Sequence, residues 1–121
     1  MFFMLLVGHA VMDYALQTEA IALEKDRHST TPLQKAVPWY YWLSAHSLCH
    51  GGAVYLITGS LSLGLLETVV HWMIDFSKSE RWFGIHVDQA LHVACKLVWW
   101  LLMVYGVSSS MDAMLPSSGR N

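Results

Sequence analysis

Long apolar stretches alternate with short polar ones along this chain, and the alternation predicts its helices. Apolar segments cover residues 2–23, 39–58, 65–76 and 85–107, and polar connections separate them. Within these segments polar side chains recur every four residues, which places them on one helix face. The pattern predicts an all-α fold, a four-helix bundle built from two antiparallel helical hairpins. Residues 1–107 would form a single helical domain and residues 108–121 a polar, flexible tail.

Composition places the predicted helices in a membrane. Hydrophobic residues make up 55% of the chain and charged residues 13%, against about 25% charged in an average globular domain. Aromatic residues cluster at 39–42 and again at 99, 100 and 105, as they do at a membrane–water interface. The segment 65–76 is short for a crossing of about 20 residues unless 61–64 joins it. We expect a membrane-inserted bundle whose main partner is the lipid bilayer.

The few charged residues give an orientation and exclude one class of partner. Lysine and arginine gather in the connections 25–38 and 77–84, so the positive-inside tendency places both loops in the cytoplasm and both termini outside. A net charge of −2 and the absence of a basic stripe argue against nucleic acid as a partner. Four short helices bury little core alone, which leaves a homo-oligomer open.

Histidine and aspartate occupy most polar positions inside the apolar segments. Each predicted helix carries one pair of metal-ligand type, four residues apart: His9/Asp13, His46/His50, His71/Asp75 and Asp88/His92. Five of the seven histidines fall in these pairs. Folding each hairpin antiparallel brings the pairs to matching levels, because facing residue numbers have equal sums. The predicted facing residues are His9 with His50, Asp13 with His46, His71 with His92, Asp75 with Asp88, and Glu67 with Lys96.

Metal binding is the chemistry that suits four such pairs. Side chains four apart on a helix have Cβ atoms about 5–6 Å apart, and four pairs supply enough N and O donors for one or two divalent cations, as in dinuclear carboxylate bundles. Imidazole with carboxylate favours zinc, with iron or manganese as alternatives. The predicted ligands are His9, Asp13, His46, His50, His71, Asp75, Asp88 and His92. Residues predicted to support them by hydrogen bonds are Gln17, Glu67, Gln89 and Lys96.

A simpler interpretation competes with each of these assignments. A single buried histidine is more often a hydrogen-bonded core residue than a metal ligand, and the Glu67–Lys96 pair is more readily structural than catalytic. Four pairs at matched levels are much harder to explain by chance than one. His28, in the first basic loop, and His86, off the Asp88/His92 face, are interpreted as solvated or helix-end residues.

The same residues resemble a small membrane family of bacteria and phages catalogued as domain of unknown function 3307. The family pattern reads HxxxDxxxQ, HxxxHG, HxxxDxxK and DQxxH after a phenylalanine. The matching residues here are His9, Asp13 and Gln17; His46, His50 and Gly51; His71, Asp75 and Lys78; and Phe83, Asp88, Gln89 and His92. The resemblance implies a polytopic protein of the bacterial inner membrane, of bacterial or phage origin. It implies no particular reaction.

The residues themselves favour a metal-dependent membrane hydrolase. A cation would activate water, and Asp75 or Asp88, near the cytoplasmic turn, would act as the catalytic general base. The substrate would be a lipid, a lipid-linked phosphate or a peptide bond near the membrane face. One alternative is a pathway for protons or metal ions, although the ligands crowd toward the basic loops rather than spreading through the bilayer. The other is a phage or bacterial interaction protein with a structural metal site.

Overall fold

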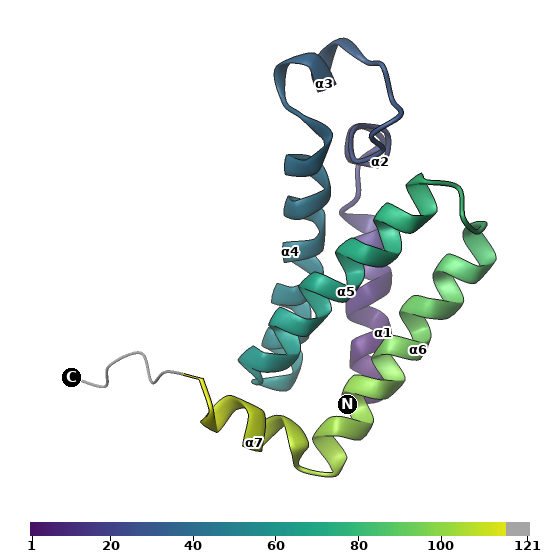
Figure 1. The fold of residues 1–121 in the computed structure, drawn as a ribbon. Coiled ribbons are helices and arrows are strands. Elements are labelled where there is room, and N and C mark those ends of the chain that lie inside the picture. The colour runs from purple at the N-terminus through teal and green to yellow at the C-terminus, as the bar shows by residue number, and fades with distance from the viewer. Residues whose placement is uncertain (116–121) are drawn as a thin grey trace.

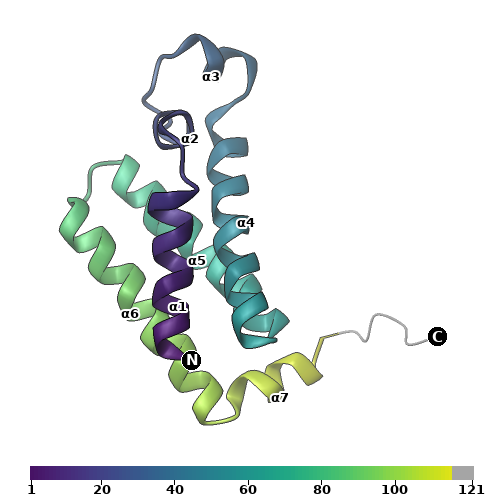
Figure 2. The same cartoon turned by 180° about the vertical axis from the view of Figure 1, so that it is seen from behind.

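The structure, a computed structural model, describes residues 1–115 and confirms the all-α prediction: this part of the chain contains helices and no strand. The helices are α1 (Phe2–Ala10), the π-helix η1 (Val11–Ala15), α2 (Glu19–Glu24), α3 (Pro32–Ala36), α4 (Trp39–Thr58), α5 (Leu61–Ser79), α6 (Ile85–Val104) and α7 (Val107–Ala113). In both views α1 lies between α4 and α6, and α5 crosses the other side (Figures 1 and 2). The short helices α2 and α3 lie at one end of the bundle and α7 at the other (Figure 1).

The first helix is not continuous, which corrects the expectation of one helix over residues 2–23. At Leu16 the backbone N–H bonds to the carbonyl of Val11, 2.9 Å away, five residues back. The chain then leaves the helix, and Thr18 begins α2 by accepting the N–H of Ile21 at 3.2 Å. Threonine is a favoured N-cap residue. The π-helix η1 carries Asp13, one of the predicted ligands, and short π-helical segments are frequent at functional sites.

Caps also explain the other differences in helix boundaries. The N–H of Leu63 donates to Ser60 Oγ, so α5 begins at Leu61 and is longer than the segment 65–76. Thr31 caps α3 inside the predicted loop. The predicted flexible tail contains α7, and Asp112 Oδ1 on this helix accepts the N–H of Ser62 at 2.7 Å. The tail residues 116–121 lie outside the described part of the chain.

Two glycines bring α4 and α5 into close contact. A Cβ added at Gly51 would lie 1.9 Å from Thr68 Oγ1 and 2.5 Å from the carbonyl oxygen of Gly64. A Cβ at Gly64 would lie 2.9 Å from the carbonyl oxygen of Gly51. Glycine is therefore required at this crossing, whereas nothing lies within 4 Å of a Cβ at Gly52.

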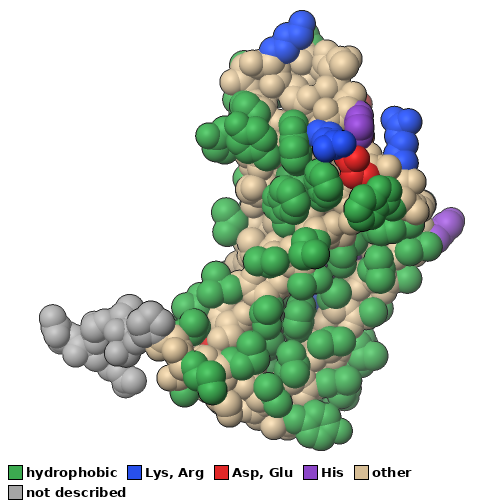
Figure 3. All heavy atoms as spheres, in the orientation of Figure 1, with side chains coloured by type: hydrophobic (Ala, Val, Ile, Leu, Met, Phe, Trp, Pro, Cys, Tyr) green, Lys and Arg blue, Asp and Glu red, His purple; other side chains and the backbone are tan. Residues whose placement is uncertain are grey.

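The interior is polar and the surface apolar over much of the bundle. Among the described residues, 14 buried positions are polar or charged and 6 are hydrophobic. A small apolar core of Leu5, Val54, Leu63 and Trp99 lies toward the α7 end. Apolar side chains cover most of the face in Figure 3, while Lys, Arg and acidic side chains gather near its upper end. Within residues 1–115, one helix, α6, is long and apolar enough to cross a membrane.

Candidate metal centre

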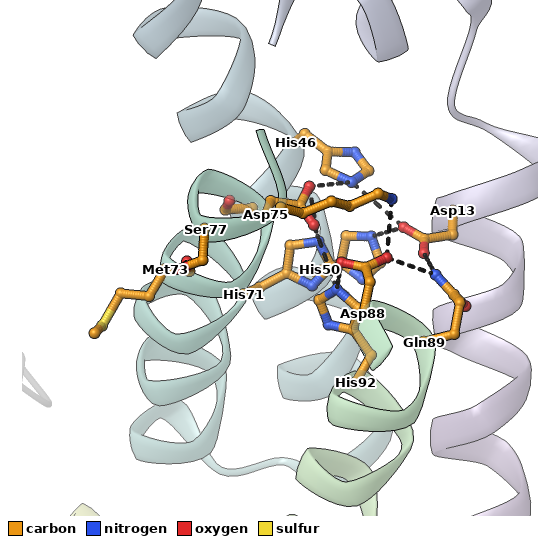
Figure 4. Close-up of polar contacts among 12 residues, drawn as sticks. Asp13, His46, His50, His71, Met73, Asp75, Ser77, Asp88, Gln89 and His92 are labelled. Atoms are coloured by element: carbon orange, nitrogen blue, oxygen red, sulfur yellow. Dashed lines mark hydrogen bonds and ion pairs between the residues drawn. The ribbon is translucent and has the colours of Figure 1, made fainter. Parts of the chain in front are cut away.

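Helices α1, α4, α5 and α6, together with η1, bring the eight predicted ligands into one cluster. Seven of these residues are labelled in Figure 4, and all eight except the partly buried Asp13 are buried. The rings of His71 and His92 stack with centroids 4.3 Å apart, and those of His9 and His50 lie 5.4 Å apart. Asp13 Oδ1 lies 3.4 Å from His46 Nε2. The facing pairs expected from the sequence are therefore adjacent in space.

The first donor group combines one carboxylate and three imidazoles. Asp13, His46, His50 and His71 each offer one atom, and these atoms all lie within 4.8 Å of one another. Asp13 Oδ1 is 3.0 Å from His50 Nε2. The Nε2 atoms of all three histidines are buried and have no hydrogen-bond partner within residues 1–115. The Nε2 atoms of His46 and His50 contact Asp13 without hydrogen-bond geometry, and that of His71 lies 3.6 Å from Asp75 Oδ2. Buried imidazole nitrogens that contact carboxylates without hydrogen bonds are unusual in a protein interior and match the donor set of a metal site.

The second donor group lies beside the first, nearer the α5–α6 turn. It consists of Asp75, Asp88 and His92. His92 Nε2 lies 3.3 Å from Asp75 Oδ1 and 3.5 Å from Asp88 Oδ1. Asp88 Oδ1 is also buried without a hydrogen-bond partner in the described residues. A third set, His9, His71 and His92, has the same closeness and overlaps both groups.

Asp75 connects the two groups. Its Oδ2 lies 3.6 Å from His46 Nε2 and 3.6 Å from His71 Nε2, while its Oδ1 faces His92. A carboxylate with one oxygen toward each donor group is placed to serve either group or both. The arrangement therefore accommodates one or two cations.

Two lysines enter the cluster that the ligand prediction did not include. Lys25 Nζ donates to Asp75 Oδ2 at 2.5 Å, and Lys78 Nζ donates to Asp88 Oδ2 at 2.9 Å. The family pattern contains Lys78, but no local signal marks Lys25, because its position depends on the chain break before α2. The two ammonium groups balance Asp75 and Asp88. Asp13 has no lysine or arginine partner within the described chain, so its charge faces imidazoles and the Gln89 amide.

The predicted supporting residues divide into three kinds. Gln89 lies among the ligands: its Nε2 donates to Asp13 Oδ2 at 3.1 Å and to Asp88 Oδ2 at 3.2 Å. Glu67 accepts from Lys96 and from Trp99 Nε1 at 2.6 Å, one turn below His71. Gln17 contacts none of the ligands by a hydrogen bond in the described chain and instead lines a neighbouring cavity.

These donors fit a divalent cation. Imidazole nitrogen and carboxylate oxygen suit zinc, iron or manganese, and the buried unpartnered atoms are the ones that a cation would engage. Cys49 and Cys95, neither of which belongs to a donor group, are free thiols. The site therefore offers nitrogen and oxygen ligands.

The fold and the cluster together define a small all-α protein with buried histidine–aspartate groups that could hold a metal ion. The chain belongs to the DUF3307 family, described as a protein of unknown function, whose sequence profile matches residues 1–118. The resemblance seen in the motifs is thus confirmed over nearly the whole chain. No curated protein matches this chain, and no solved structure does.

Proposed function

We propose that this protein is a metal-dependent hydrolase embedded in a membrane. The observation that carries the proposal is the first donor group, in which three buried Nε2 atoms form no hydrogen bond among residues 1–115. Those of His46 and His50 lie 3.4 and 3.0 Å from Asp13 Oδ1, and that of His71 lies 3.6 Å from Asp75 Oδ2. Leaving several buried polar atoms unpaired costs about 1–3 kcal/mol each, and a cation would remove that cost. Zinc is the metal we expect, because histidine-rich sets with a carboxylate are typical of zinc enzymes.

Polar side chains inside the bundle and apolar side chains on its surface support a location in the membrane. Large apolar side chains project from the outer faces of the long helices; examples are Leu56 (82% exposed), Val69 (57%) and Met73 (59%). Apolar patches of this extent on a soluble monomer are rare. We place the bundle in a bacterial inner membrane, with the α2–α3 end and the α5–α6 turn on the cytoplasmic side.

A bound cation would supply Lewis acidity and would lower the pKa of a coordinated water. Asp75 is the carboxylate best placed to accept a proton from that water, because it contacts residues of both donor groups. It also lines the cavity at the cytoplasmic mouth. Lys25 holds its Oδ2 and thereby fixes the carboxylate. Asp88 is the second candidate base but does not line that cavity.

The far end of the bundle favours an enzyme over an ion pathway. Below the histidines, Glu67 accepts hydrogen bonds from Lys96 and Trp99, and its Oε1 lies 3.4 Å from His71 Nδ1. The apolar core of Leu5, Val54, Leu63 and Trp99 lies at the same end. A pathway would need polar groups that continue through this region. The cluster thus opens toward one side of the bundle.

The direct test is metal analysis of the protein purified in detergent without chelators. We expect about one or two equivalents of zinc, iron or manganese per chain, together with hydrolysis of ester or phosphoester substrates that a chelator abolishes and the metal restores. The variant Asp75→Asn should lose hydrolysis. Less than about one-tenth of an equivalent of metal would refute the proposal, as would metal flux across liposomes without any turnover.

A further inference from the structure

A cavity of about 270 Å³ lies at the cytoplasmic mouth of the metal centre. It is lined by Gln17, Ala22, Lys25, Asp26, Asp75, Lys78, Ser79 and Arg81. Asp75 belongs to the second donor group, so the cavity adjoins the groups that would bind metal. A molecule in this cavity would touch both the metal centre and three cationic side chains.

The cavity lining holds three cations and two carboxylates, Asp26 and Asp75, so its net positive charge suits an anion. Lys25 and Lys78 reach Asp75 and Asp88 from this side. A cation in the metal centre would take over the charge of those carboxylates and leave both ammonium groups free to face the cavity. Arg81 makes no ion pair within residues 1–115, unlike Lys25, Lys78 and Arg27. Its guanidinium offers donors in a fork that matches phosphate.

The backbone at Arg81 gives an independent reason to assign this side chain a role. Its φ is +62°, in the left-handed region that glycine occupies most easily. Arg81 follows Glu80, the C-cap residue of α5. Its N–H bonds to the carbonyl of Lys78 at 2.8 Å, and that of Trp82 bonds to the carbonyl of Ser77 at 3.2 Å. This is the helix-ending position at which glycine is usual. An arginine there carries a backbone cost, and such strain persists mainly where the side chain is needed.

We propose that this cavity binds a phosphate group, held by Lys25, Lys78 and Arg81, and that the substrate of the hydrolase is a phosphate-bearing molecule. The inference rests on the proposed function for the reaction and for the release of Lys25 and Lys78 by a bound cation. The contribution of Arg81 to binding does not depend on the metal, because this side chain makes no ion pair in residues 1–115. Gln17 also lines the cavity, and its Oε1 is buried without a hydrogen-bond partner among the described residues. Its side-chain amide adds a neutral polar group beside the three cations.

The surroundings of the cavity favour a lipid phosphate over a soluble one. Leu23 on α2 is 50% exposed, and Trp82, next to Arg81, is 72% exposed. Apolar side chains beside a basic pocket are typical of sites at the headgroup level of a membrane. A lipid could place its phosphate in the cavity while its chains remain along the apolar outer face of the bundle.

The test compares phosphate binding by the wild type and Arg81→Gly in detergent. Glycine suits the backbone at this position, so the variant should fold at least as well as the wild type. Lys35→Ala, which removes an exposed cation in α3, is the charge-matched control. We expect Arg81→Gly to bind dioctanoyl phosphatidic acid and inorganic phosphate at least about tenfold more weakly, which corresponds to one charge-assisted hydrogen bond. Equal affinity in the wild type and Arg81→Gly would overturn the proposal.

Two further measurements distinguish a lipid phosphate from a soluble one and test the phosphate site separately from the hydrolase proposal. Tighter binding of phosphatidic acid than of inorganic phosphate, with no binding of dioctanoyl glycerol, supports a lipid substrate. Equal Arg81-dependent binding of both phosphates supports a soluble one. Metal content is measured on the same samples. Protein that holds metal but binds neither phosphate refutes the phosphate site alone, and protein that binds phosphate without ever holding metal refutes the hydrolase alone.

Discussion

The imidazole rings of His50 and His71 stack with their centroids 3.6 Å apart. The two residues come from α4 and α5, whose backbones approach closely at the Gly51–Gly64 crossing. Two protonated rings at this distance would repel each other, so the stack suits neutral imidazoles, the form that binds metals. Both Nε2 atoms lack a hydrogen-bond partner in residues 1–115. The stack therefore brings two Nε2 atoms into the same donor group.

Replacing His50 should lower the metal content of the protein, whereas replacing a histidine outside the donor groups should not. We expect His50→Ala to lower the metal content of the purified protein at least about tenfold, because one of three imidazole donors of the first group is lost. Inductively coupled plasma mass spectrometry provides the measurement. His86→Ala, which removes an exposed histidine outside every donor group, should keep the wild-type metal content. Full metal retention in His50→Ala would contradict the assignment of this ligand.

The crossing of α4 and α5 should tolerate no side chain at Gly51. Gly51→Ala would force the helices apart, since the new Cβ meets Thr68 and the backbone of Gly64, and we expect a loss of about 1–3 kcal/mol in the free energy of unfolding. Gly52→Ala is the matched control, because its Cβ meets nothing and alanine favours a helix by up to about 1 kcal/mol. Denaturant unfolding in micelles gives both values. Equal effects of the two changes would argue against the observed crossing.

Replacing one member of the buried Glu67–Lys96 pair should lower the free energy of unfolding. Both side chains are 1% exposed. Lys96→Met leaves the Glu67 carboxylate with Trp99 as its remaining donor, and we expect a loss of about 3–5 kcal/mol. The double variant Glu67→Gln/Lys96→Met should recover part of this loss, because it leaves no uncompensated charge. Lys35→Met, at an exposed site, should change stability by less than about 0.5 kcal/mol. A double variant no more stable than Lys96→Met would contradict this account.

The docking of α7 on α5 should depend on pH through Asp112. The N–H of Ser62 donates to this carboxylate at the N-terminus of α5, and this bond lowers the pKa of Asp112 below its ordinary value. A lowered folded-state pKa means that the contact stabilises docking above the unfolded pKa of about 3.9. This stabilisation is lost as the pH falls through the folded pKa. The amide shift of Ser62, followed by NMR from neutral to acidic pH, should titrate below that value. In Asp112→Ala the titration should vanish, and a titration that persists would assign it to another group.

The clustering of the histidines and aspartates is the part of the site that the sequence could predict. A spacing of four fixes which residues share a helix face, and short connections force neighbouring helices to run antiparallel. Together these two constraints place His71 opposite His92 and Glu67 opposite Lys96, and the structure has both pairs in contact. Helical periodicity depends only on residues near one another in the sequence, so it can be recognised without the rest of the fold.

The lysines, the cavity and the break after α1 depended on tertiary structure. The π-turn at Val11–Ala15 ends the helix that a continuous apolar pattern predicted, and this break lets Lys25 reach Asp75, 50 residues away. Arg81 reaches the cavity through a backbone conformation that its side chain disfavours. Lys78 belongs to the HxxxDxxK motif, but Lys25, Arg81 and the break after α1 follow neither a period nor a motif. The sequence by itself determined which side chains face the interior, because that follows from helix geometry, and the three-dimensional packing decided which charges join them there, because that depends on contacts between segments far apart in the chain.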